Sequence, residues 1–107
     1  MLITETNVPD AALPVAALKV HLRMVTGFSD AGVQDVVLVS FLRAAMAAIE
    51  ARTGKVLLER EFTLSVNALR NANALPLTVA PVTAIADVQL VTRSGIEQLV
   101  NASVYWL

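Results

Sequence analysis

The dominant pattern in the chain is a nearly unbroken run of apolar and alanine positions over residues 36–49. At 3.6 residues per turn, such a run covers more than one side of an α-helix. Ser29 or Asp30 is expected to cap the start of this helix, because short polar side chains accept hydrogen bonds from its first free N–H groups. Gly54 is expected to end it, because glycine tolerates the left-handed conformation that closes a helix. The pattern predicts one long helix over residues 29–54.

The predicted long helix is apolar on more sides than a small domain covers. Only Ser40 and Arg43 interrupt the run, and they share a narrow stripe with Ala47 and Glu50. A broad apolar face lies on the other side and holds Leu38, Phe41, Leu42, Ala45, Ala48 and Ile49. The valines beside this face would still contact water if only one side were covered. We therefore expect a second side to be buried, either within the domain or against another chain.

The residues before the long helix predict an arm and a short helix. Residues 1–13 mix polar residues and proline with scattered apolar ones, which is typical of a flexible N-terminal arm that becomes ordered only in an assembly. Pro14 suits the first turn of a helix, where its missing N–H would be unpaired anyway. Leu18 and Leu22 share a face at helical spacing, so residues 15–24 are predicted to form a short, half-buried helix.

After the long helix, the apolar period changes from helical spacing to alternation. The alternation predicts short strands at residues 59–67, 75–79, 82–92, 96–100 and 104–107, with a turn at residues 93–95 that joins the third strand to the fourth. The last four residues, V-Y-W-L, would be sticky at an exposed sheet edge. We expect this ending either to pair with something or to continue beyond Leu107 in the natural protein.

Together these elements predict an α+β fold. Two N-terminal helices, one short and one long and apolar, precede a small antiparallel sheet of four or five strands. The flexible arm covers residues 1–13, and residues 14–107 form a single domain with its helices in 14–54 and its strands in 55–107. A chain of 107 residues has room for one such domain with a modest core.

The composition strengthens the case for a partner. Hydrophobic residues make up 56% of the chain and charged residues 16%, compared with about 45–50% and about 25% in soluble domains. The net charge of -1 leaves no basic field that would bind nucleic acid through its phosphates. The chain has no cysteine, and its first twenty residues lack the basic start and apolar core of a signal peptide. The apolar run is shorter than the roughly 20 residues that cross a bilayer, so no membrane contact is expected.

Residues that could carry catalysis or bind a metal or cofactor are scarce. His21 is the single histidine, so a metal site would need carboxylates for every other ligand, and a structural or surface role is expected. The four glycines are widely spaced and form no phosphate-binding loop. Glu59 and Glu61 would point the same way on a strand, as a paired acid and base do, but Lys55 and Arg60 nearby favour a solvated charged face. No catalytic residue, metal or cofactor is therefore expected.

The aromatic residues Tyr105 and Trp106 allow two interpretations. They could stack on a peptide or small ligand, or they could pack against a neighbouring chain, and the second interpretation is favoured. Taken together, the residues favour an interaction module over an enzyme.

Several segments, in this order, resemble the head–tail connector (adaptor) proteins of tailed phages, which also occur in prophages and gene transfer agents. The segments are L-P-V-A-A-L-K-V-H-L-R at 13–23, E-A-R-T-G-K-V-L at 50–57, P-V-T-A-I-A-D-V at 81–88 and Y-W-L at 105–107. The resemblance covers nearly the whole chain from about residue 13. The sequence departs from the family pattern in two ways. Residues 25–32 lack the acidic cluster often found between the helices, and the sequence ends where many relatives continue.

The resemblance implies a structural, non-enzymatic ring protein, commonly of twelve copies, beneath the portal at the capsid vertex. Its partners would be other copies of itself, the portal protein and a tail-side stopper or tail-completion protein. Packaged double-stranded DNA would pass transiently through its channel. The particle would assemble in the bacterial cytoplasm, with this chain at the head–tail junction.

In a ring, each copy has two neighbours, so two faces of one helix can be buried by different chains. We hypothesise that Leu38, Leu42, Ala45 and Ile49 face the chain's own sheet. The surface that contacts a neighbour or partner is then expected to include Arg43, Ala44, Met46, Ala47, Ala48, Glu50, Tyr105 and Trp106. Two alternatives to the ring are a homo-oligomeric soluble module that binds a peptide or small ligand, and, less favoured, a carboxylate enzyme built on Glu59 and Glu61.

Overall fold

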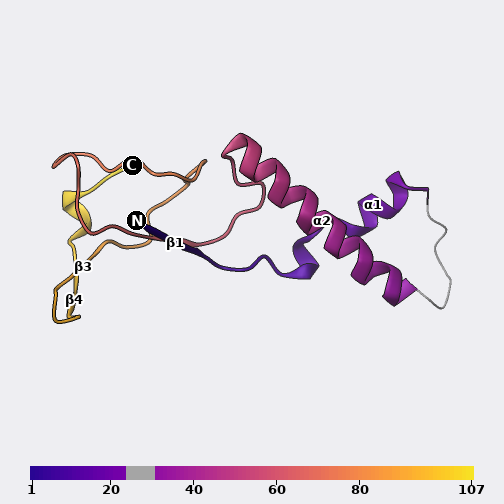
Figure 1. The fold of residues 1–107 in the computed structure, drawn as a ribbon, viewed down its shortest axis with the longest axis horizontal. Helices are drawn as coiled ribbons and strands as arrows, with labels where there is room; N and C mark the ends of the chain where they lie inside the picture. Colours follow the sequence, from indigo (N-terminus) through magenta and orange to yellow (C-terminus); the bar gives the residue numbers. More distant parts are fainter. Residues whose placement is uncertain (24–30) are drawn as a thin grey trace.

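The computed structural model describes residues 1–23 and 31–107 and has an elongated shape of 57 × 27 × 23 Å (Figure 1). Its radius of gyration is 19.3 Å, compared with about 13 Å for a compact domain of about 100 residues. Helices α1 (Val15–His21) and α2 (Ala31–Thr53) occupy one end of the molecule, and the hairpin of β3 (Gln89–Val91) and β4 (Glu97–Leu99) lies at the other. An extended chain of this kind exposes much of the apolar surface that a compact domain would bury.

Helix α2 (Ala31–Thr53) is the longest element. It ends where the sequence predicts, because Gly54 has a φ of 68° and donates its N–H to the Glu50 carbonyl at 2.9 Å. The predicted caps Ser29 and Asp30 lie outside the described residues. The prediction of an apolar helix is wrong for α2 as a whole, because charged residues lie along it and several of them pair with other elements. The charged residues are Asp35, Arg43, Glu50 and Arg52.

Helix α1 (Val15–His21) follows Pro14, as predicted, but is shorter than expected. Arg23 adopts a φ of 55°, a conformation that does not continue a right-handed helix. The helix packs against α2, and Lys19 forms an ion pair with Asp35. The short helix is therefore half-buried on the side that faces α2.

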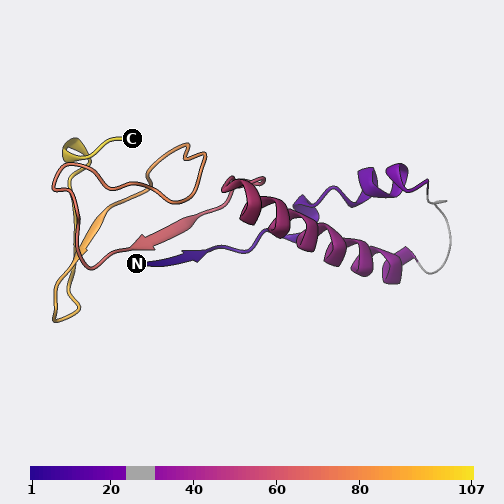
Figure 2. The ribbon, with the colours of Figure 1, turned by 45° about the horizontal axis from the view of Figure 1, so that its top comes forward.

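The predicted single sheet of four or five strands is wrong, because the strands form two separate two-stranded sheets. Strand β1 (Leu2–Glu5) pairs antiparallel with β2 (Phe62–Ser65), and Leu2 lies opposite Ser65 (Figure 2). Strand β3 (Gln89–Val91) pairs antiparallel with β4 (Glu97–Leu99). The physical reason is that β2 takes its partner from the predicted N-terminal arm and not from the following strands. The sequence pattern does not predict β1.

The C-terminal half has less regular structure than its alternation predicts. The described backbone has no strand at residues 75–79 or 104–107, and the predicted strands 59–67 and 82–92 shrink to β2 and β3. Pro76 and Pro81 lack the N–H that a sheet ladder needs, which is one reason for this difference. A short 3-10 helix, η2 (Ala102–Val104), replaces the start of the last strand. The predicted turn is confirmed, with Gly95 at a φ of 82°.

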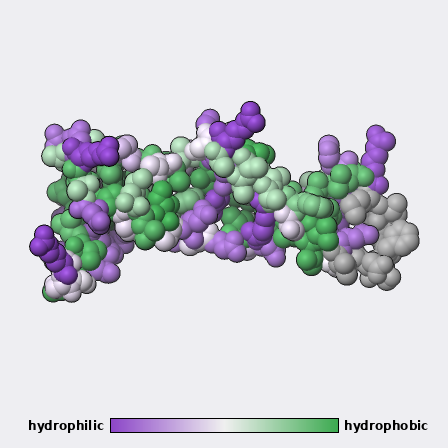
Figure 3. Space-filling view, viewed as in Figure 1, coloured by the Kyte–Doolittle hydropathy of each residue, from purple (hydrophilic) through white to green (hydrophobic). Residues whose placement is uncertain are grey.

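The core of the molecule is small. Among the described side chains, the buried apolar ones are Val8, Leu13 and Leu38. Val8 and Leu13 flank the 3-10 helix η1 (Asp10–Ala12), which follows β1. Figure 3 shows apolar side chains at the surface of both the sheet end and the helix end. Within residues 1–23 and 31–107, no helix is both long enough and apolar enough to span a membrane.

Candidate interaction site

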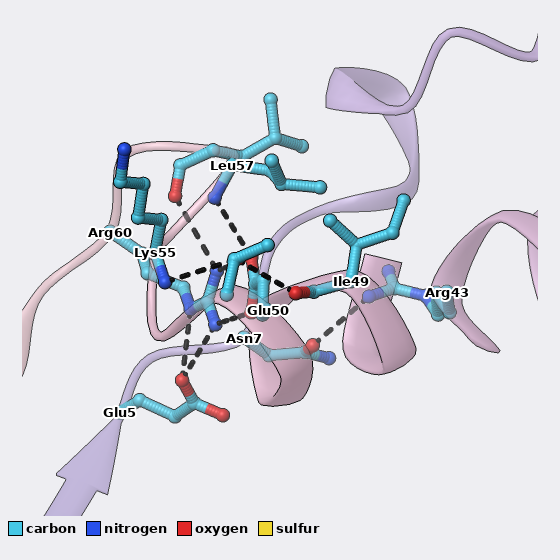
Figure 4. A network of polar contacts seen from close by, with 10 residues as sticks. Glu5, Asn7, Arg43, Ile49, Glu50, Lys55, Leu57 and Arg60 are labelled. Carbon is cyan, nitrogen blue, oxygen red and sulfur yellow. Dashed lines mark hydrogen bonds and ion pairs between the residues drawn. The ribbon is translucent and has the colours of Figure 1, made fainter. Parts of the chain in front are cut away.

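Arg60 lies at the junction between the helices and the β1–β2 ribbon (Figure 4). Its guanidinium donates to both carboxylate oxygens of Glu50 on α2, from Nη1 to Oε1 at 3.0 Å and from Nη2 to Oε2 at 2.7 Å. Its Nε donates to Oε2 of Glu5 on β1 at 2.9 Å. The guanidinium carbon also lies 5.0 Å from the centre of the Phe62 ring. One side chain therefore connects β1, α2 and the segment before β2.

The environment of Glu50 favours its ionised form. The hydrogen bond from Arg60, followed by that from the Leu57 backbone N–H at 3.0 Å, lowers the pKa of Glu50 from 4.5 to about 2. The hydrogen bond to Glu50 raises the pKa of Arg60 above its ordinary value. The side chains of Arg60 and Glu50 are only 11% and 17% exposed. The pair is thus a partly buried, doubly hydrogen-bonded salt bridge that remains charged at neutral pH.

Arg43 makes a second connection from α2, to the segment that follows β1. Its Nη1 donates to Oδ1 of Asn7 at 3.2 Å, and its Nη2 donates to the Val8 carbonyl at 2.6 Å. Nη2 also forms an ion pair with Asp10. Together with Arg60, Arg43 fastens residues 5–10 along one side of α2.

An open pocket of about 280 Å³ lies between these two arginines. It is lined by Glu5, Thr6, Asn7, Val8, Arg43, Met46, Ala47, Glu50 and Arg60. The charged groups that line it are already paired, Arg60 with Glu5 and Glu50, and Arg43 with Asp10. Within residues 1–23 and 31–107, no three His, Asp or Glu side chains lie close enough together to hold a metal ion.

The structure separates the predicted interface residues of α2 into two groups. Arg43, Met46, Ala47 and Glu50 line the pocket, beside the chain's own N-terminal segment. Arg43 and Glu50, which were expected on the surface that contacts a neighbour, form ion pairs with residues of their own chain. In contrast, Ala44 and Ala48 are exposed on another side of the helix. Contact of any of these residues with a neighbouring chain stays a prediction.

The predicted inner face of α2 is covered differently from expectation. Leu38 is buried and Leu42 is half-buried, but Ala45 and Ile49 are exposed. The expectation that these residues face the chain's own sheet is wrong, because α2 contacts α1, residues 7–10 and residues 57–60 instead. The covered positions run along the helix at three- and four-residue spacing. They are Asp35, Leu38, Val39, Leu42, Arg43, Met46 and Glu50.

The remaining candidates lie apart from this site. Trp106 is 83% exposed, Tyr105 is half-buried, and neither lines the pocket. Glu59 and Glu61 are exposed, as a solvated face predicts, but Arg60 between them is not. The sequence reasoning missed the role of Arg60, because its partner Glu5 is 55 residues away along the chain. His21 is exposed at the end of α1.

No family model and no curated protein matches the chain. Among solved structures, one similar chain comes from the neck of an empty gene transfer agent particle, computed with C6 symmetry. It is 46% identical, the match covers 94% of this chain and 52% of that chain, and the TM-score is 0.87. A second comes from the virion of a native gene transfer agent particle, at 47% identity, with 95% and 53% coverage and a TM-score of 0.84.

The present chain spans about half the length of the chains that it matches. The match extends through both the helix end and the sheet end of the present chain, since it covers nearly all of the residues of this chain. The chain is therefore similar, in fold and in close to half of its aligned residues, to a chain in the neck of a gene transfer agent particle.

Proposed function

We propose that this chain is a structural component of the neck, the head–tail junction, of a gene transfer agent or related phage-like particle. The observation that carries the proposal is the 46% identity over 94% of the chain, with a TM-score of 0.87, to a chain of such a neck. Shared fold alone would be weak support, because one fold serves many functions. Identity at this level along nearly the whole chain is a stronger argument for a shared role.

The shape of the molecule supports a role in an assembly. With an elongated outline and three buried apolar side chains among the described residues, the single chain leaves many of its large apolar residues in water. Apolar patches of this kind are typical of surfaces that contact other proteins. Binding to neighbours would cover them and stabilise the folded chain by mass action.

The finer role that we propose is that of an adaptor ring beneath the portal. Copies of the chain would surround a channel, contact the portal on the capsid side and meet a tail-completion protein on the other side. The net charge of -1 suits this role, because a strongly basic channel would hold the DNA that has to pass through it. A structural role of this kind requires no catalysis, and we expect none.

A gene deletion in the producing cell tests the proposal. Without the chain, capsids are expected to package DNA but to remain without tails, and electron micrographs would show full, tailless heads. Expression of the chain from a plasmid should restore tailed particles. Normal numbers of tailed, transfer-competent particles in the deletion strain would contradict the proposal.

The alternative of a ligand-binding module receives no support from the site. Trp106 lies outside the pocket, and the charged groups that line the pocket are already paired.

A further inference from the structure

An apolar stripe on α2 remains exposed in the part of the chain that the structure describes. We define this outer stripe as Val37, Phe41, Ala44 and Ala48, all of which are exposed. Val37 is 46% exposed and Phe41 is 64% exposed. Their spacing of four, three and four residues is that of a seam that packs against another helix. The alanines in the stripe permit a second backbone to approach closely.

Helix α1 carries a second apolar face that is also uncovered. Ala16, Ala17 and Val20 are exposed, and Val20 has 78% of its surface open to water. Leu18 and Lys19 are half-buried on the side that contacts α2. The outer face of α1 is therefore the face that points away from α2.

These two uncovered surfaces lie on opposite sides of the helix pair. Lys19 of α1 pairs with Asp35 of α2, and Asp35 belongs to the covered side of α2, together with Leu38. At 100° per residue, Ala44 lies about 180° and Phe41 about 120° around the helix from Asp35. The pair thus presents α1 on one side and the outer stripe of α2 on the other.

We propose that α1 of one copy packs against the outer stripe of α2 in the next copy around the ring. This inference rests on the proposed function, and it names the contact that joins the copies. A cyclic assembly of more than two copies needs two different surfaces that fit each other, one on each side of the chain. Contact between two α2 stripes would instead close as a dimer and would leave Val20 in water.

The proposed contact between two copies is small. Helix α1 has seven residues and spans roughly 10 Å, whereas α2 spans roughly 35 Å. A contact of this length buries less than the roughly 800 Å² per partner of a stable pair. Pairs of free chains are therefore weakly associated, and closure of the ring supplies the missing stability.

Cysteine cross-linking in particles tests the contact directly, because the chain has no cysteine of its own. The test variant combines Val20→Cys with Phe41→Cys, and purified particles are treated with a short bismaleimide. A ladder of cross-linked multimers on a denaturing gel is expected, since each copy would join to both neighbours. Each single variant should give monomers only. Dimers from Phe41→Cys alone would overturn the proposal in favour of contact between two α2 helices.

A matched control pairs Val20→Cys with Leu90→Cys, because Leu90 on β3 is also well exposed but lies outside the proposed contact. This control should give no ladder. Absence of a ladder from particles that contain the double variant would overturn the contact and leave the neck role standing. A ladder in cell lysates, with the chain absent from particles, would support the contact and contradict the neck role. No ladder in either preparation would overturn the contact.

Discussion

Arg60 and Glu50 form a two-point salt bridge that joins the segment before β2 to the last turns of α2. The pair lies where the helix end of the molecule meets its sheet end, and Glu5 on β1 is held by the same guanidinium. Among the described side chains, the buried apolar ones are Val8, Leu13 and Leu38, and none of them lies in this pair.

Replacing Arg60 by methionine should destabilise the chain by about 1–3 kcal/mol, because it leaves the partly buried Glu50 carboxylate with an unmet hydrogen-bonding need. Urea unfolding followed by circular dichroism measures this change. Arg70→Met, at an exposed position, is the matched control and should have an effect within about 0.5 kcal/mol. Equal effects of the two variants on the free energy of unfolding would show that the Arg60–Glu50 salt bridge does not stabilise the fold.

The stability of the chain should fall in acid because of Glu50. Its folded-state pKa of about 2 is below the ordinary value of 4.5. The stabilisation is therefore fully present above about pH 4.5 and is lost as the pH falls towards about 2. The measurement is the free energy of unfolding across this range for the wild type and for Glu50→Gln. The variant is expected to be less stable at neutral pH and to lose less stability on acidification; parallel curves would contradict this assignment.

Replacing Arg43 by lysine should loosen the segment that follows β1, although the charge is kept. A lysine ammonium does not reproduce the branched guanidinium group of Arg43, which contacts Asn7, Val8 and Asp10 together. The cost to global stability is expected to be under about 1 kcal/mol, because Asp10 is largely exposed. Hydrogen exchange should instead accelerate at the amides of Ala12 and Leu13, which donate to carbonyls in this segment.

Arg52→Lys serves as the control for that experiment, because Arg52 is exposed near the end of α2 and none of the described contacts depends on it. It should leave exchange at residues 12 and 13 unchanged. If the Arg43 variant also leaves these two amides unchanged, Arg43 does not hold the segment.

Placing an arginine at Ala44 should block assembly without unfolding the chain, because Ala44 is exposed on the outer stripe of α2. Circular dichroism should report an unchanged fold, and particles should lack the chain. Ala47→Arg is a different case, because Ala47 lines the pocket beside Arg43 and Arg60. A third positive charge there should weaken the chain itself. Normal incorporation of the Ala44 variant into particles would contradict the role of the outer stripe.

The local features of the chain follow from its sequence. The end of α2 at Gly54 and the turn at Gly95 are predicted correctly, because both positions require a positive φ that glycine adopts readily. The existence of two helices and of the hairpin is also predicted, since apolar periodicity reflects local backbone geometry. The surplus of apolar residues by itself indicates a partner.

The tertiary structure alone decided which distant segments meet. Strand β1 pairs with β2, and Arg60 reaches Glu5, across about half of the sequence. The periodicity of neighbouring residues does not encode these contacts, because they depend on the path that the chain takes before and after α2. For the same reason, the sequence correctly marks Arg43 and Glu50 as unusual within an apolar helix but does not reveal that their partners lie in the same chain.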